Sequence, residues 1–239
     1  GLLGGHSGQD IDKERQNADL LMARMIQRLL KETKGQLVSF NGGTKDNAIP
    51  RECEASLIYE SDEEAAKAEE LACELAETYA EELTPAEPDF SCEISCETNR
   101  TAEAIPQDAA KEFICAMRLA PNGIQKRNIK MDGFVVVSLN LGVVRTEEDR
   151  IVMIFSPRSS VASLQEDTKE RLNTLAETFG FTVSHSSEYP GWSFKEDSPV
   201  REICKESYKE LFGEDLKIEA IHAGLECGLF SDAIKGLDA

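Results

Sequence analysis

The order of the expected secondary-structure elements is the feature that most limits how this chain can fold. Apolar residues at three-and-four spacing predict helices over residues 16–33, 62–83, 106–120 and 160–180. Short alternating or apolar runs predict strands over residues 36–40, 48–60, 90–98 and 181–189, and two more within residues 133–160. The order helix, strand, strand, helix, strand therefore occurs twice.

Each copy of this order is typical of a split βαβ unit, which forms an antiparallel sheet with its helices on one face. The repeat is one of architecture, because no repeat of individual residues accompanies it. We therefore predict an α+β fold of two ferredoxin-like halves that share or extend one sheet. The proline-marked break at residues 84–89 separates the halves, which we place at about residues 1–86 and 87–188.

The C-terminal residues show a different pattern of expected elements. A loop with the only tryptophan precedes an expected helix capped by Ser198, a strand at residues 216–221 and a glycine-containing junction at residues 222–230. These elements have no place in the repeated order. We therefore expect residues 189–239 to be an α/β piece of another domain.

Composition excludes several classes of partner. The net charge of −19 argues against nucleic acid, which requires a basic face, and against anionic membranes. No apolar run is long enough to predict a transmembrane helix. The seven cysteines are odd in number and lie mostly in apolar patterns, so we expect free thiols and a cytoplasmic location. The chain begins inside a motif and without Met, so we expect a fragment of a longer protein.

Motifs of self-contained catalysis are absent from the sequence: it has no P-loop, dinucleotide fingerprint, HExxH helix or GxSxG elbow. Cys92 and Cys96 are four residues apart, which would place both thiols on one face of a strand. A metal site there would need further ligands that the neighbouring sequence does not supply. A metal–thiol protein therefore remains only a third alternative.

Five residues at four positions are candidates for a binding or catalytic site. His6 lies within a glycine frame, Asn47 lies at a turn that enters a strand, and Arg158 leaves a very apolar strand. Gly224 and Glu226 lie in a segment whose glycines allow close backbone approach. Each has a plain structural interpretation as well: a solvated histidine, a turn asparagine, a strand-end arginine and a tight turn.

Together, the segments GLLGGHSGQDI, NAIPRE, SLNLGVV, PGW with SPV, and HAGLECGLF resemble one family, in this order and over essentially the whole chain. The family is that of the cytosolic aminoacyl-histidine dipeptidases, which are carnosinase-like Xaa-His dipeptidases. It belongs to the zinc-dependent aminoacylase and carboxypeptidase-like metallopeptidase clan.

The resemblance implies a catalytic domain that is interrupted by a lid. Residues 1–188 would form the lid, which is of the dimerisation type, and residues 189–239 would return to the catalytic domain. Such a metallodipeptidase holds two zinc ions, and a glutamate acts as general base on metal-bound water. The family's metal ligands and its general base have no match in this chain. The resemblance therefore implies no metal ligand here, and a fragment that is inactive by itself.

The resemblance also assigns roles to the five candidates. His6 would stabilise the oxyanion, Asn47 would contact the substrate near the scissile bond, and Arg158 would bind the terminal carboxylate of a dipeptide. Gly224 and Glu226 would line the substrate. A homodimer through the lid is implied as well. The preferred dipeptides, and whether His6 serves its own subunit or a partner's, stay open.

A rival hypothesis comes from the fold alone. Tandem ferredoxin-like units also occur as stand-alone ligand-binding or dimerisation modules, and a fold does not determine a function. The C-terminal residues discriminate between the two hypotheses. Residues 190–239 make sense as part of a split catalytic domain and fit poorly in a regulatory module.

Overall fold

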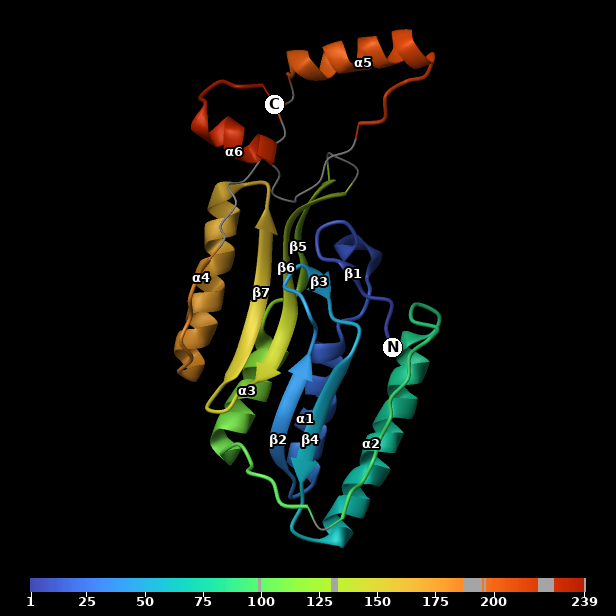
Figure 1. The fold of residues 1–239 in the computed structure, drawn as a ribbon, viewed down its shortest axis with the longest axis vertical. Helices are drawn as coiled ribbons and strands as arrows, with labels where there is room; N and C mark the ends of the chain where they lie inside the picture. The colour runs from blue at the N-terminus through green and yellow to red at the C-terminus, as the bar shows by residue number, and fades with distance from the viewer. Residues whose placement is uncertain (99, 130–132, 187–194, 196, 219–225, 239) are drawn as a thin grey trace.

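The computed structural model describes residues 1–239 except 99, 130–132, 187–194, 196, 219–225 and 239 (Figure 1). The described strands are β1 (Gly5–His6), β2 (Gln36–Gly42), β3 (Ala48–Ile49), β4 (Cys53–Ile58), β5 (Gly123–Asn128), β6 (Phe134–Thr146) and β7 (Ile151–Ser159). The described helices are the 3-10 helix η1 (Ile11–Lys13) and α1 (Ala18–Glu32), α2 (Asp62–Leu83), α3 (Gln107–Leu119), α4 (Ala162–Phe179), α5 (Pro199–Phe212) and α6 (Glu226–Ala233). None of these helices is long and apolar enough to cross a membrane.

The long strand β6 joins the two halves of the chain into one antiparallel sheet. Strand β7 pairs with β6 along most of its length, from Val137 to Thr146. Strand β5 pairs with the first part of β6, and β2 pairs with β6 only at Gly42 and Val144. Strands β2 and β5 pair with residues of β6 that also pair with β7, so β2 and β5 must lie along the other edge of β6. The resulting sheet order is β4-β2-β6-β5, with β7 beside β6.

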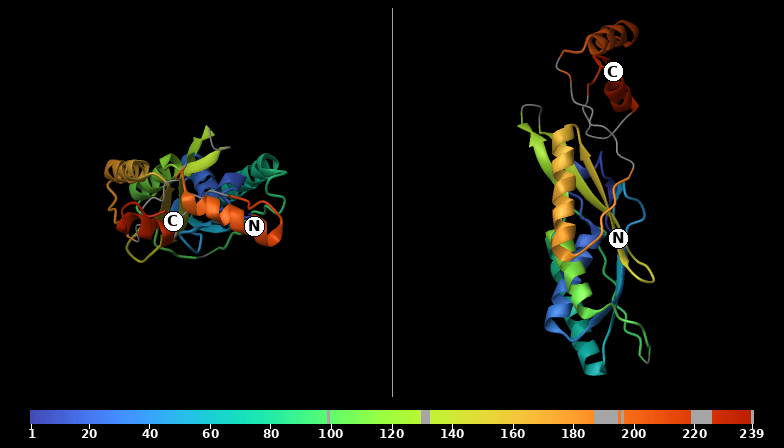
Figure 2. Two further views of the ribbon diagram at one scale, coloured as in Figure 1. Left: turned by 90° about the horizontal axis from the view of Figure 1, so that it is seen from above. Right: turned by 90° about the vertical axis from the view of Figure 1, so that its left-hand side faces the viewer.

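Four helices cover one face of this sheet. They lie side by side in the order α2, α1, α3, α4, as Figures 1 and 2 show. The core lies between this layer and the sheet, where Phe40 of β2 and Phe113 of α3 meet edge to face with ring centroids 5.4 Å apart. The predicted α+β class and the antiparallel sheet shared by two halves are thus confirmed.

Local sequence signals fix where the first two helices begin. The Asn17 side chain accepts hydrogen bonds from the amides of Asp19 and Leu20, and the Ser61 side chain accepts one from the Glu64 amide. Both residues are favoured helix caps because they satisfy amides that lack a partner within the helix. The predicted helix over 62–83 is therefore α2, and the helix predicted from residue 16 begins two residues later as α1.

The predicted strand over residues 90–98 is wrong. Its alternation is real, because Phe90, Cys92 and Ile94 pack against the core. Its neighbour is helix α2 rather than a strand, since Cys92 lies near Cys73 of that helix. The backbone N–H and C=O groups of a helix interior are already hydrogen-bonded, so α2 cannot pair with this segment as a strand would. Residues 90–98 therefore form no β-strand.

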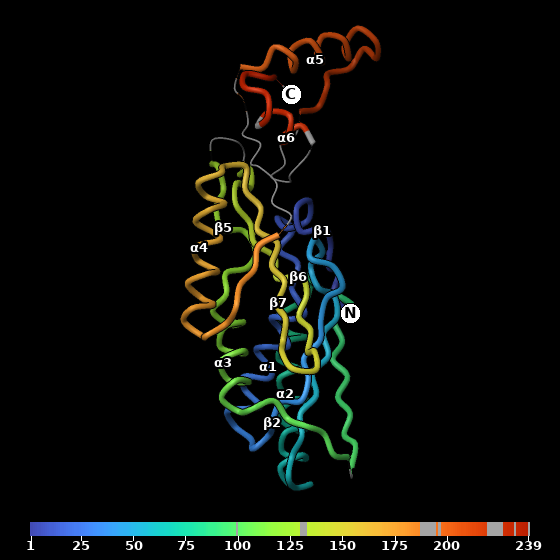
Figure 3. Tube along the Cα trace, turned by 60° about the vertical axis from the view of Figure 1, so that its left-hand side comes forward, coloured from blue at the N-terminus to red at the C-terminus, as the bar shows by residue number. Residues whose placement is uncertain are grey.

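The strand predicted over 181–189 is also wrong as far as residues 181–186 are described. This segment follows α4 back along its length, where the His185 ring is 3.0 Å from the Asn173 side chain (Figure 3). The strand predicted over 216–221 is absent from the described residues 216–218. The proposed domain boundary at 188–189 lies outside the described residues. Strand β5, conversely, was not expected, because its sequence GIQKRN is mostly polar.

One carboxyl group is buried with little compensation in the first turn of α1. Asp19 is fully buried, and the Cys53 thiol is the hydrogen-bond partner that its carboxylate has among the described residues. It faces Cys53 and Gly42 of the sheet, and a Cβ at residue 42 would lie 1.7 Å from Asp19 Oδ1. Burial raises the pKa of Asp19 to about 7, and the Cys53 thiol offsets only part of this effect. Folding therefore favours the protonated carboxyl.

Candidate functional site

A small two-stranded sheet brings together the first two predicted site residues. Strand β1 pairs with β3 so that His6 is opposite Ala48. The Ser7 amide then donates a hydrogen bond of 2.9 Å to the carbonyl of Asn47. His6 and Asn47, which are far apart in sequence, therefore lie next to each other. His6 is partly buried and Asn47 is exposed.

The third predicted residue reaches the same place from the other half of the chain. Arg158 lies near the end of β7, and its Nε donates a hydrogen bond of 3.3 Å to Ser7 Oγ. Ser7 is fully buried, so this contact fixes the guanidinium against the loop that carries His6. Three residues chosen from the sequence thus converge around Ser7.

The guanidinium of Arg158 is suited to bind an anion. Burial lowers the pKa of Arg158, and the nearby Asp46 carboxylate raises it, so the group stays charged at neutral pH. Among the described residues its only hydrogen bond is the one through Nε. Its two terminal nitrogens are thus available for a planar, two-bond contact with a carboxylate.

The ring of His6 has a defined tautomer. Its Nδ1 accepts hydrogen bonds from the amides of Gly8 (3.2 Å) and Gln9 (3.1 Å). An atom that accepts two N–H groups carries no proton, so the neutral ring has its hydrogen on Nε2. His6 therefore presents an N–H donor, which is the group that stabilises a developing negative charge.

The tight backbone around His6 explains the glycines that frame it. Asp10 Oδ2 accepts a hydrogen bond of 2.8 Å from the His6 amide, and the Asp10 amide donates one of 2.9 Å to the His6 carbonyl. Gly4 has a φ of +61°, and a Cβ there would lie 2.2 Å from the Arg51 side chain. Only glycine fits this position without strain.

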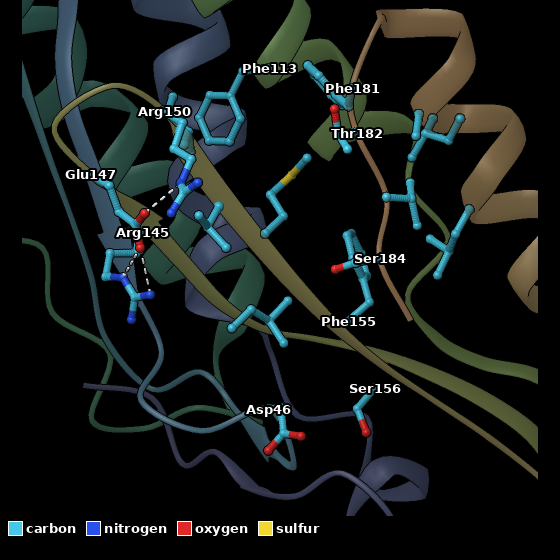
Figure 4. Close-up of a pocket in the computed structure, with 18 of the residues that line it drawn as sticks. Asp46, Phe113, Arg145, Glu147, Arg150, Phe155, Ser156, Phe181, Thr182 and Ser184 are labelled. Atoms are coloured by element: carbon cyan, nitrogen blue, oxygen red, sulfur yellow. Dashed lines mark hydrogen bonds and ion pairs between the residues drawn. The ribbon is translucent and has the colours of Figure 1, made fainter. Parts of the chain in front are cut away.

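These residues lie at one end of a cavity of about 1820 Å³, here named the β7 groove. Its walls include residues 145–160, Phe113 and residues 180–186. Figure 4 shows Asp46 and Ser156 at the end next to the site, and Glu147 bound to Arg145 and Arg150 at the other end. Apolar residues of β7 thus line the middle of the groove, and both of its ends are polar.

Sequence reasoning missed the residues that support the site. Asn140 is almost fully buried, and its amide nitrogen donates to the carbonyls of Asp46 (3.1 Å) and Ala48 (2.8 Å), on either side of Asn47. The signal was a polar residue inside the apolar run of β6, which predicts a buried hydrogen bond. Ser7 gave no signal beyond its place beside His6.

Two candidates from the sequence lie in the C-terminal part of the chain. Gly224 lies outside the described residues, and Glu226 is the first residue of α6. No group of three or more His, Cys, Asp or Glu side chains that could hold a metal occurs in the part of the chain that the structure describes. The described residues therefore do not fit a zinc centre.

Comparison with known proteins gives three findings. Residues 1–87 match the peptidase dimerisation domain. The chain is 33% identical over 242 residues to the cytosol non-specific dipeptidase of Escherichia coli (strain K12). The alignment covers 100% of this chain and 49% of that protein. The crystal structure of aminoacylhistidine dipeptidase from Vibrio alginolyticus superposes with a TM-score of 0.85 and 35% identity, over 97% of this chain and 47% of that one. The chain thus spans about half the length of these relatives.

Proposed function

We propose, from the match of residues 1–87 to the peptidase dimerisation domain, that the chain is the lid and substrate-binding part of a dipeptidase that hydrolyses Xaa-His dipeptides. The observation that carries the proposal is the convergence of His6, Asn47 and Arg158 at one end of the β7 groove. A dipeptide presents a carbonyl at its peptide bond and a carboxylate at its C-terminus. A site for it needs an N–H donor and a cation, and this site has both.

Each residue then has a role toward the dipeptide. His6 donates its Nε2 hydrogen to the oxyanion that forms when water attacks the peptide carbonyl. Asn47 contacts the substrate near the scissile bond, and Arg158 binds the terminal carboxylate. Gly224 and Glu226 line the substrate from the C-terminal part of the chain.

Activation of the attacking water is assigned to groups outside this chain. When bound, two zinc ions would lower the pKa of that water, and a glutamate would take its proton. The described residues form no cluster of three or more side chains that could hold these ions. The proposed roles of His6, Asn47 and Arg158 involve no contact with the metal.

We expect Arg158→Ala, in the full-length peptidase, to raise KM for β-alanyl-histidine about 10- to 100-fold with little change in kcat. Hydrogen bonds to a charged group contribute about 1.5–3 kcal/mol, which corresponds to this loss. Steady-state kinetics measure both constants. The amide β-alanyl-histidinamide lacks the carboxylate, so the wild type should discriminate against it and Arg158→Ala should not.

The control is Arg145→Ala, which removes an arginine from the far end of the same groove. Its ion pair with Glu147 is exposed and contributes little, so KM should stay near the wild-type value. An unchanged KM in Arg158→Ala, or equal discrimination by both enzymes, would show that Arg158 does not bind the carboxylate.

We expect the isolated chain to bind no zinc tightly under reducing conditions and to hydrolyse no β-alanyl-histidine. The physical reason is that the described residues form no cluster of three or more metal-binding side chains. Equilibrium dialysis with zinc and a hydrolysis assay on the same sample measure both properties. Tight stoichiometric zinc would contradict the assignment of the metal to the rest of the peptidase.

We also propose that the peptidase is a cytoplasmic homodimer that associates through this lid. The support is the description of the family that residues 1–87 match, and the cytosol name of the Escherichia coli relative. The rival hypothesis of a stand-alone ferredoxin-like ligand-binding or dimerisation module gives the C-terminal residues no role. The similarity to a dipeptidase structure, in contrast, covers 97% of the chain.

A further inference from the structure

The loop that presents His6 begins and ends at one buried carboxylate. Glu87 Oε2 accepts a hydrogen bond of 2.7 Å from the Leu3 amide, and Glu87 Oε1 accepts one of 2.9 Å from the Gln16 amide. Glu87 itself follows the end of α2, where its amide donates to the Leu83 carbonyl. One side chain therefore closes the loop 3–16 at both ends.

The chemistry of Glu87 is specific to this task. Its side chain is only 2% exposed, and among the described residues it forms no ion pair with a lysine, an arginine or a histidine. A buried carboxylate without a cation is costly unless donors surround it. Both oxygens are used on backbone amides, and a glutamine could accept only one of the two bonds.

Further hydrogen bonds hold the loop together between these two bonds. Asp10 exchanges hydrogen bonds with the amide and carbonyl of His6, and Arg15 donates to the Gly4 carbonyl. Movement of either end therefore moves His6 with it. The start of α1 follows directly, at Ala18, so the Gln16 bond also fixes the loop to the helix layer.

We propose that Glu87 is a positioning residue for His6, which acts by closing the loop 3–16 so that the Nε2–H donor meets the reacting carbonyl. This inference rests on the proposed role of His6. Displacement of a catalytic group by about 1 Å can reduce a rate about 100-fold. Loss of one of the two bonds should therefore change turnover more than substrate binding.

The test compares Glu87→Gln with Glu81→Gln in the full-length peptidase. Glu81 is an exposed glutamate of α2, so its variant controls for the loss of one negative charge nearby. We expect Glu87→Gln to lower kcat about 10- to 100-fold with KM within about twofold, and Glu81→Gln to match the wild type. Wild-type kcat in a folded Glu87→Gln enzyme would overturn the proposal.

A double variant distinguishes this proposal from the function on which it rests. If Glu87 acts through His6, Glu87→Gln should lower kcat no further in a His6→Ala background. An equal loss in both backgrounds would overturn the positioning role. A His6→Ala enzyme with normal kcat would instead show that the proposed role of His6 is wrong.

Amide hydrogen exchange on this chain gives a measurement that needs no activity. In Glu87→Gln we expect faster exchange at Leu3, His6 and Gln16, with the core strands β2 and β6 unchanged. Faster exchange throughout the chain would mean that Glu87 supports the whole fold rather than the loop, and would overturn the proposal. If Glu87→Gln does not fold, Glu87→Asp keeps both oxygens on a shorter stem and should show a smaller loss of kcat.

Discussion

His6→Ala should lower kcat of the full-length peptidase about 100- to 1,000-fold and leave KM within about twofold. This is the loss that follows removal of one donor to an oxyanion, about 2.7–4 kcal/mol of transition-state stabilisation. The effect falls on kcat because the charge on the carbonyl oxygen develops only in the transition state. The structure supports the donor role, since two backbone amides donate to Nδ1 and leave the hydrogen on Nε2.

Two further variants make this result specific. His185→Ala removes an exposed histidine that contacts Asn173, and it should leave kcat unchanged. His6→Gln restores an N–H donor on a flexible side chain and should recover part of the lost rate. A His6→Ala enzyme whose KM rises while kcat is unchanged would show that His6 binds the ground state instead.

Asp19→Asn should remove a large pH dependence of stability. The folded-state pKa of Asp19 is about 7, against an ordinary value of 3.8, so the folded protein binds this proton more tightly than the unfolded chain. Stability from this group is therefore complete below about pH 4, falls as pH rises to about 7, and is constant above. One pKa unit corresponds to about 1.4 kcal/mol, so the fall is up to about 4 kcal/mol.

Urea unfolding of the wild type and Asp19→Asn at several pH values tests this prediction. The variant should match the wild type near pH 4 and be more stable above pH 7, because the asparagine buries no charge. Asp12→Asn, at an exposed aspartate of η1, is the control for loss of one carboxylate. Parallel stability curves for the wild type and Asp19→Asn would mean that folding does not raise the pKa of Asp19.

Much of the fold is predictable because short-range signals specify it. The cap at Ser61 and the glycine at residue 180 delimit α2 and α4, and both helices occupy the predicted ranges. The strand predictions over 90–98 and over the described residues 181–186 are wrong because alternation reports which side chains are buried, not what they pair with. Phe90 and Cys92 pack against the core, but helix α2 is their neighbour.

The residues of the candidate site also include some that the sequence predicts and some that it does not. His6, Asn47 and Arg158 were predictable because the resemblance named them, and the structure places all three on one groove. Glu87 was not predictable, because a glutamate between two prolines is typical of an exposed connection between elements. Its role depends on two backbone amides that are separated from it by 84 and 71 residues. A single sequence gives no sign of contacts of this range.

The junction between the two halves of the chain has a consequence for the size of the substrate. One ladder pair, Gly42 with Val144, connects β2 to β6, and the Thr146 hydroxyl adds hydrogen bonds with the amide and carbonyl of Phe40 across the same junction. His6 belongs to the first half and Arg158 to the second. The spacing between the proposed oxyanion donor and the proposed carboxylate-binding cation therefore depends on how the halves are joined, at this junction and through the hydrogen bond from Arg158 to Ser7. Under the proposed function, a substitution at this junction would change the length of peptide that fits between the two groups without changing either group.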